Sequence, residues 1–328
     1  MAKNVMAVYD TDEEYVMRLM NYFSETRPVD IEIQGFTDLN YLKDYAGNRQ
    51  LDVLLVQDTE MCGDIEEMKI GKIMVLSEGE YETEDGKGHK TIYKYQSTEN
   101  IVREVMCYYA EEPTVHIGVV NSTRGRLIGV YSPVKRSLKT SFALCLGQIL
   151  SHSRKTLYID IEDYHGFNAI LNQNFMADIS DLLFYIQQSK QNFPCKLASV
   201  VQRLGPLDFI PPAISPEDLK QVSPEDWMHF LNEVLACNYD YVIVDIGDSV
   251  REVTGILEAC ETVYTPVRED FISRAKLEQY ETWLRIMECE AVLEKTEKLS
   301  FPFFNDLEGS PENLENTSLG DYVRRMLE

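Results

Sequence analysis

The chain has 328 residues, of which 44% are hydrophobic and 26% charged, which is typical of a globular protein with two domains. Its 31 basic and 55 acidic residues give a net charge of −24, which repels a phosphate backbone, so we expect no nucleic-acid partner. Seven cysteines without a C-x-x-C pair, and five histidines without ligand spacing, predict reduced thiols, a cytoplasmic location and no structural metal.

Residues 1–112 form the first predicted domain, because short apolar runs alternate there with helical patterns. Strands are expected at 4–9, 29–36, 51–58, 71–78 and 91–96. Helices are expected at 11–23, 39–46 and 97–112. Five strands alternating with helices predict a doubly wound parallel sheet of the flavodoxin-like type.

The alternation begins again in residues 113–328, the second predicted domain. A hairpin is expected at 115–132, where "VHIGVV" and "LIGVYS" flank the turn-rich "NSTRGR". Further strands are expected at 155–163, 207–213, 239–249 and 261–270. Helices are expected at 141–151, 179–188, 223–237, 272–288 and 319–327. The fold class is therefore α/β with two doubly wound domains, and ligands should bind beyond the carboxyl ends of the parallel strands.

Three features of the second domain meet at that edge. Lys139 and Thr140 occupy the last two places of a G-x-x-x-x-G-K-[ST] spacing and open a helix that follows a strand. The free amides of a helix N-terminus and a lysine can bind a phosphate, and the threonine hydroxyl can bind the magnesium ion that accompanies it. Asp245 ends the strand "YVIVD", and Asp160 and Glu162 end "LYIDIE". Thr140, Asp160 and Asp245 are thus candidate magnesium ligands, some of them through water. The alternative is a plain helix cap with a solvated lysine, and acidic residues that only solvate loops.

Residues 126–290 resemble the MinD/ParA group of P-loop ATPases, whose loop reads K-G-G-x-G-K-[ST]. The resemblance runs through "YSPVKRSLKTSFALCLGQIL", "LYIDIED" and "YDYVIVDIGDS". With its receiver-like first half, the chain is similar to the TadZ/CpaE proteins of Flp (Tad) pilus assembly, which pair a pseudo-receiver with an atypical MinD-like domain. The resemblance implies ATP and Mg²⁺ as cofactors, a homodimer, and other pilus-assembly proteins as partners. It also implies a cytoplasmic location at a cell pole or on the inner face of the membrane.

The loop departs from that family, because the positions of the family's glycines fall on Pro133, Lys135, Arg136 and Leu138. The family's signature lysine falls on Val134, and Lys135 or Arg136 could replace its charge. The resemblance implies that Asp160 and Glu162 are the two switch carboxylates, which makes them the candidate catalytic residues. The expected nucleotide-binding residues are Lys135, Arg136, Ser137, Leu138, Lys139, Thr140, Ser141 and Asp245, with Pro266 and Arg268 near the adenine.

Binding tolerates these departures better than turnover does, because turnover needs groups placed to fractions of an ångström. We therefore expect Mg-ATP binding with slow or absent hydrolysis. An active ParA/MinD-type positioning ATPase and a response regulator that binds no nucleotide are the alternatives.

A phosphorylatable receiver needs an acidic pair, an acceptor aspartate, a Ser or Thr and a lysine after successive strands. The chain has Tyr9-Asp10, Gln57, Ser77 and Lys94 in these places. Glutamine cannot accept a phosphoryl group as aspartate does, and Asp58, one residue further, should point to the opposite face in a regular strand. We expect a docking domain that is not phosphorylated, against the alternative of a shifted receiver that uses Asp58.

The last helical pattern is apolar on one side, with Leu319, Tyr322, Val323, Met326 and Leu327. The family resemblance suggests a membrane-targeting helix, but two arginines make a poor basic face. Packing on its own domain or on a partner is the prediction, with membrane association at most peripheral.

Overall fold

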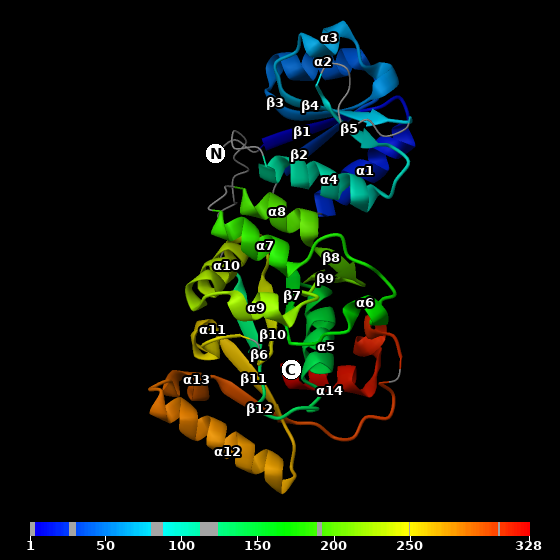
Figure 1. Cartoon of the computed structure of the whole chain (residues 1–328). Coiled ribbons are helices and arrows are strands. Elements are labelled where there is room, and N and C mark those ends of the chain that lie inside the picture. The colour runs from blue at the N-terminus through cyan, green and yellow to red at the C-terminus, as the bar shows by residue number, and fades with distance from the viewer. Residues whose placement is uncertain are drawn as a thin grey trace. The chain divides into compact units, whose positions relative to one another are not determined.

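The computed structural model describes residues 4–25, 31–79, 88–111, 124–188, 192–248, 250–307 and 309–328. The chain divides into two compact units (Figure 1). The first comprises Met1–Asn121 and Lys190–Ser199, and the second comprises Ser122–Ser189 and Val200–Glu328. The boundary predicted between residues 112 and 113 lies outside the described residues.

The first unit contains a five-stranded parallel sheet in the order β2-β1-β3-β4-β5, one of the two common orders of doubly wound sheets. The strands are β1 (Asn4–Tyr9), β2 (Ile31–Phe36), β3 (Leu51–Gln57), β4 (Ile70–Ser77) and β5 (Lys90–Tyr93). Alternate side chains of β1 and β3 are buried on opposite faces of the sheet, because helices cover both of them (Figure 1). All five strands end at one edge, which collects the residues that follow them.

The helices of this unit are α1 (Glu13–Glu25), α2 (Leu39–Asn48), α3 (Gly63–Glu66) and α4 (Thr98–Glu111), with the 3₁₀ turn η1 (Asp58–Glu60). Helix α8 (Phe193–Val200) contributes residues 193–199 to the same unit. Helix α2 starts where the side chain of Asp38 accepts a hydrogen bond from Asn40 N at 2.7 Å. Leu42 of α2 is completely buried against the sheet.

The second unit contains a seven-stranded sheet in the order β12-β11-β6-β10-β7-β9-β8. The strands are β6 (Arg126–Val130), β7 (Thr156–Ile161), β8 (Gln202–Leu204), β9 (Leu207–Ile210), β10 (Tyr241–Ile246), β11 (Thr262–Val267) and β12 (Thr296–Ser300). Only β8, at one edge, runs antiparallel to its neighbour. The α/β class predicted from the sequence is confirmed.

Strand β6 does not pair in the hairpin that the sequence predicted at 115–132. Parallel strands β10 and β11 occupy both edges of β6, so no hydrogen-bonding edge remains for a hairpin partner. The other arm of the predicted hairpin, residues 115–120, lies outside the described residues.

The helices of the second unit are α5 (Lys139–Ser151), α6 (Phe167–Ile170), α7 (Ile179–Gln187), α9 (Pro216–Gln221), α10 (Pro224–Ala236), α11 (Val253–Ala259), α12 (Phe271–Ile286), α13 (Glu290–Glu294) and α14 (Ser318–Leu327), with the 3₁₀ turn η2 (Pro311–Asn316). Helix α5 follows the central strand β6 and is apolar nearly all round, so it is buried along most of its length. Its Phe142, Cys145 and Leu146 are completely buried in the core.

Residues 311–328, which we call the C-terminal segment, pack on α5. Leu319 and Val323 of α14 are completely buried in the core that α5 shares. The side chain of Gln148, on α5, donates to Pro311 O at 2.7 Å and accepts from Glu315 N at 3.2 Å. The apolar side of α14 is therefore used for packing within its own unit, as predicted.

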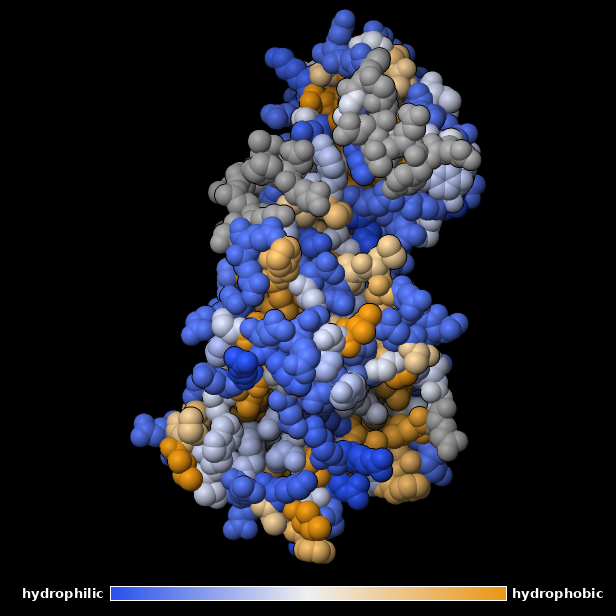
Figure 2. Space-filling model, viewed as in Figure 1, coloured by the Kyte–Doolittle hydropathy of each residue, from blue (hydrophilic) through white to orange (hydrophobic). Residues whose placement is uncertain are grey.

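The surface agrees with the acidic composition. The face in Figure 2 is mostly hydrophilic, and its apolar side chains form small separate groups. Across the part of the chain that the structure describes, no helix is long and apolar enough to cross a membrane.

Candidate functional site

The loop between β6 and α5 makes its turn with two non-glycine residues in the left-handed region. The φ angles are 57° at Arg136 and 62° at Leu138, two of the positions where the resembled loop carries glycine. The left-handed conformation costs a residue with a Cβ roughly 1–2 kcal/mol. The loop thus keeps a glycine-type backbone at an energetic cost.

Serine side chains fix this loop from inside. Ser137 Oγ donates to Val134 O at 3.0 Å, and Val134 N donates to Ser132 Oγ at 3.1 Å. Ser132 Oγ in turn donates to Pro266 O of β11 at 2.6 Å. Both serines are buried, so these hydrogen bonds are shielded from water and help to offset the strained backbone.

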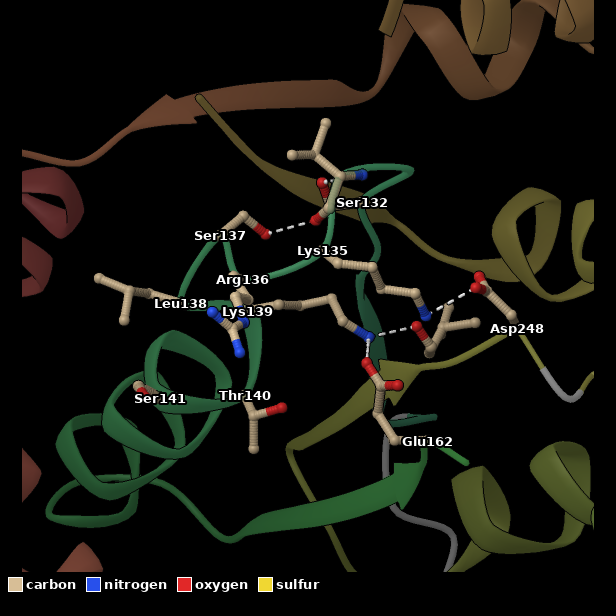
Figure 3. Close-up of a pocket in the computed structure, with 12 residues that line it drawn as sticks. Ser132, Lys135, Arg136, Ser137, Leu138, Lys139, Thr140, Ser141, Glu162 and Asp248 are labelled. Atoms are coloured by element: carbon tan, nitrogen blue, oxygen red, sulfur yellow. Dashed lines mark hydrogen bonds and ion pairs between the residues drawn. The ribbon is translucent and has the colours of Figure 1, made fainter. Parts of the chain in front are cut away.

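The loop, the start of α5 and the ends of β7 and β10 enclose a cavity of about 350 Å³ (Figure 3), within the usual range for small-molecule sites. Its lining residues are Ser132, Val134, Lys135, Arg136, Ser137, Leu138, Lys139, Thr140, Ser141, Glu162, Ile246 and Asp248. All seven loop and helix residues from 135 to 141 that the sequence singles out lie on this wall.

Lys139 is at the centre of the site. Its Nζ lies 2.8 Å from Asp245 Oδ1, forms an ion pair with Glu162, and donates to the carbonyl oxygen of Ile246. Burial by itself would lower the pKa of this ammonium group, but the charges of Asp245 and Glu162 outweigh it and raise the pKa. Lys139 therefore stays charged and satisfied by this chain's own groups.

Asp160 and Asp245 pair in register on neighbouring strands and share one hydroxyl. Tyr158 Oη lies 3.3 Å from Asp160 Oδ2 and 3.2 Å from Asp245 Oδ2. Burial and the charge of Asp245 hold the pKa of Asp160 well above its ordinary range. Asp160 also accepts from Glu162 N at 2.8 Å, and it lies beneath the cavity instead of on its wall.

Tyr158 was not anticipated from the sequence, although a signal was present. Residues two apart in a strand face the same side, so Tyr158 shares the face of Asp160. A hydroxyl two residues before a strand-end carboxylate is a candidate partner for it.

Two cations at the mouth of the cavity differ in their pairing. Lys135 Nζ lies 2.6 Å from Asp248 Oδ2, whereas no acidic side chain among the described residues pairs with the exposed Arg136. Arg268, expected near the adenine, donates to Arg136 O at 3.4 Å and pairs with Asp270 at 3.4 Å. Arg268 and Pro266 thus contact the loop and do not line the cavity. Asp248 was not singled out from the sequence.

The oxygen atoms around Lys139 fit a magnesium ion. Of the three predicted magnesium ligands, Thr140 lines the cavity, whereas Asp160 and Asp245 are buried and absent from its wall. Glu162, predicted as a catalytic residue, lines the cavity beside Thr140. Apart from the ion pair with Lys139, Asp245 Oδ1 has no hydrogen-bond partner among the described residues. Mg²⁺ prefers oxygen ligands and usually retains water and phosphate oxygens. Accordingly, the described residues contain no group of three acidic, His or Cys side chains that alone could hold a metal.

A second polar cluster lies at the carboxyl edge of the first unit's sheet. Lys94 Nζ lies 2.7 Å from the buried Asp10 and 3.5 Å from Glu78, and Gln57 Nε2 donates to Glu78 at 2.8 Å. Burial lowers the pKa of Lys94, but hydrogen bonds and charges from Asp10 and Glu78 raise it by more. Gln57 and Lys94 are thus connected through Glu78, which the sequence analysis did not single out.

The expectation for Asp58 needs correction. It assumed a regular strand, but β3 ends at Gln57 and Asp58 begins the turn η1. Ser77 Oγ donates to Asp58 Oδ2 at 3.3 Å, so Asp58 contacts one of the residues of the predicted receiver-like site.

No protein-family model matches the sequence, and no curated protein matches it significantly. Among solved structures, the chain is similar to a ParA family ATPase of Chlorobium tepidum, with 20% identity, a TM-score of 0.48, and coverage of 62% of this chain and 100% of that one. It is also similar to a plasmid partition protein of Borrelia burgdorferi bound to AMPPNP, with 15% identity and a TM-score of 0.45. That match covers 62% of this chain and 100% of the other. A third similar structure is cobyrinic acid a,c-diamide synthase of Mycobacterium smegmatis, with 15% identity and a TM-score of 0.42. The match covers 61% of this chain and 81% of that one. At these identities and scores the likeness assigns neither activity nor ligand to this chain.

Proposed function

We propose that the second unit binds Mg-ATP in the cavity above α5. The observation that carries this proposal is the position of Lys139, which opens α5 directly after a left-handed loop and contacts Asp245 and Glu162. A helix N-terminus with free amides, a lysine and nearby carboxylates is a combination that suits a phosphate group and its cation.

Each group has a role in this proposal. The amides of the loop and of the first turn of α5 bind phosphate oxygens, and Lys139 neutralises their charge. Thr140, Glu162 and Asp245 hold Mg²⁺, directly or through water. The bound cation neutralises phosphate charge. Arg136, which has no acidic partner among the described residues, supplies the charge of the family's signature lysine, while Lys135 is held by Asp248.

Slow or absent hydrolysis is part of the proposal. Both candidate catalytic carboxylates are already engaged, Asp160 by Tyr158 and Glu162 N, and Glu162 by Lys139. A general base must be free to take a proton from water, and neither residue is free in this arrangement. In the nucleotide-bound state that we propose, Mg²⁺ replaces Lys139 as the partner of Glu162, so the alternative, an active positioning ATPase, requires Glu162 to be free of both.

The wider role follows from the sequence resemblance. We infer a scaffold of Flp pilus assembly, in which Mg-ATP stabilises a homodimer and the first unit is a pseudo-receiver that docks a partner protein. The glutamine at position 57 supports the docking role, because it cannot accept a phosphoryl group. The protein then acts in the cytoplasm, at a pole or on the inner face of the membrane.

Calorimetric titration with Mg-ATP tests the binding. Lys139→Ala should lower the affinity at least about tenfold, because a hydrogen bond to a charged group contributes about 1.5–3 kcal/mol. Lys220→Ala removes an exposed lysine of the same unit, paired with Glu217, and should leave the affinity unchanged. Sedimentation with and without Mg-ATP measures the dimer, and steady-state phosphate release measures turnover. Unchanged affinity in Lys139→Ala would contradict the proposal.

A further inference from the structure

The pairing of Lys139 carries an inference that rests on the proposed function and deepens it. We infer that Lys139 is released to a phosphate only when a divalent cation takes over the charge of Asp245 and Glu162. ATP without a metal should therefore be a poor ligand of this chain, because these carboxylates compete with it for Lys139.

The hydrogen-bonding capacity of Lys139 is fully used. An ammonium group has three donors, and three acceptors surround this one: Asp245, Glu162 and the carbonyl of Ile246. Figure 3 shows the contact with Glu162. The side chain is 11% exposed, against 0% for Asp245 and 18% for Glu162. A phosphate oxygen can gain Lys139 only if one of these acceptors loses it.

Among the described residues, no cation other than Lys139 forms an ion pair with Asp245 or Glu162. Asp245 is completely buried, and removing one partner of a buried ion pair leaves an uncompensated charge, which is strongly unfavourable. Lys135 is paired with Asp248, and the exposed Arg136, at the mouth of the cavity, forms no ion pair with either carboxylate in the described part of the chain. The remaining neighbour in register, Asp160, is another carboxyl group.

The strand ends that carry these two carboxylates also lie very close together. Gly247, which follows β10, lies so close to the end of β7 that an added Cβ would be 2.6 Å from Glu162 Cα and 2.7 Å from Ile161 O. The two strand ends that carry Asp245 and Glu162 are therefore packed backbone to backbone. A cation with oxygen ligands is the remaining way to compensate them, and the hydroxyl of Thr140 stands on the same wall.

The test compares ATP titrated in EDTA with ATP titrated in magnesium chloride. In the wild-type protein the affinity with magnesium should exceed that without metal by about 100-fold or more. Glu162→Gln keeps the shape of the side chain but loosens its hold on Lys139, so metal-free ATP should bind about tenfold more tightly than to wild type. Asp245→Asn should act in the same direction.

A matched control separates this effect from the general charge of the protein. Glu261→Gln removes the same charge just before β11, at the opposite end of that strand from the loop contact at Pro266, and should leave metal-free affinity as in wild type. Equal wild-type affinity with and without metal would overturn the inference but not the proposed function. No tighter metal-free binding in Glu162→Gln would also overturn the inference. Absence of any Mg-ATP binding to the wild-type protein would overturn both.

Discussion

At the scale of single residues, the loop before α5 keeps a glycine-type turn without glycine. Arg136 and Leu138 both have positive φ, and the hydrogen bonds of Ser132 and Ser137 hold them there. This strain is stored in the native state and can be measured. Arg136 is the better position for the measurement, because its side chain is exposed and contributes little packing.

Arg136→Gly should stabilise the second unit by about 0.5–1 kcal/mol, since relief of roughly 1–2 kcal/mol of strain is partly offset by the entropy of glycine. The neighbouring Lys135 has no positive φ, so Lys135→Gly should destabilise the unit instead. Urea unfolding followed by tryptophan fluorescence measures both, because the two tryptophans of the chain, Trp227 and Trp283, lie in the second unit. The same sign for both variants would contradict the assignment of strain to Arg136.

The sequence predicts the position of this loop but not its conformation. The spacing of Lys139 and Thr140 after an apolar strand predicts where α5 begins. Neither Arg136 nor Leu138 is a residue type that predicts a left-handed backbone, since such residues rarely adopt that conformation. The acid-tipped strands are likewise visible in the sequence, whereas the contacts of Lys139 with Asp245 and Glu162 depend on strand order, which no local pattern gives.

At the scale of elements, apolar periodicity identifies the buried strands and misses the two edge strands of the second sheet. Strands β3, β7 and β10 are continuous apolar runs because helices cover them on both faces. Strands β8 and β12 are short or polar edge strands, and only one residue of β12 is buried, so no pattern marks them. The hairpin prediction fails for a related reason, because β6 looks like any apolar strand and its central place is decided by β10 and β11.

The C-terminal segment is the element whose packing can be tested most directly. A Cβ added at Gly320 would lie 2.0 Å from Glu315 O, a backbone atom that cannot move away easily. Gly320→Ala should therefore destabilise the second unit by about 1–3 kcal/mol. Gly255→Ala is the matched control, because nothing lies within 4 Å of the added atom in helix α11, and it should stabilise by up to about 1 kcal/mol. Equal effects would mean that α14 does not pack on η2 in this way.

At the scale of the whole molecule, each unit has a polar cluster at the carboxyl edge of its sheet, and each cluster is centred on a lysine held by acidic side chains. In the second unit a helix N-terminus faces that cluster, which suits a phosphate. In the first unit Gln57 occupies the position that the sequence analysis compared with a receiver's phosphoryl acceptor, and Lys94 is already held by Asp10 and Glu78. We therefore expect the cluster of the second unit to bind a phosphate group and the cluster of the first unit not to accept one covalently.

Incubation of the intact chain with acetyl phosphate and Mg²⁺ should leave its mass unchanged. Gln57 cannot form an acyl phosphate, and Asp58, which lies in η1, accepts a hydrogen bond from Ser77. Intact-protein mass spectrometry measures the outcome, with an authentic receiver domain as the positive control. A phosphoryl group on Asp58 would show that the first unit is an active receiver with a shifted acceptor.

Cys145 of α5 can report whether the C-terminal segment stays packed on that helix. Its thiol is completely buried and donates to Leu314 O at 3.6 Å, and burial raises its pKa to about 12. The thiolate attacks alkylating reagents, so this sulfur is expected to react when residues 311–328 move away and expose it to the reagent. The rate of alkylation at Cys145, followed by peptide mapping, thus measures how often residues 311–328 detach from α5. The measurement needs no substitution in the protein and can be made with and without nucleotide.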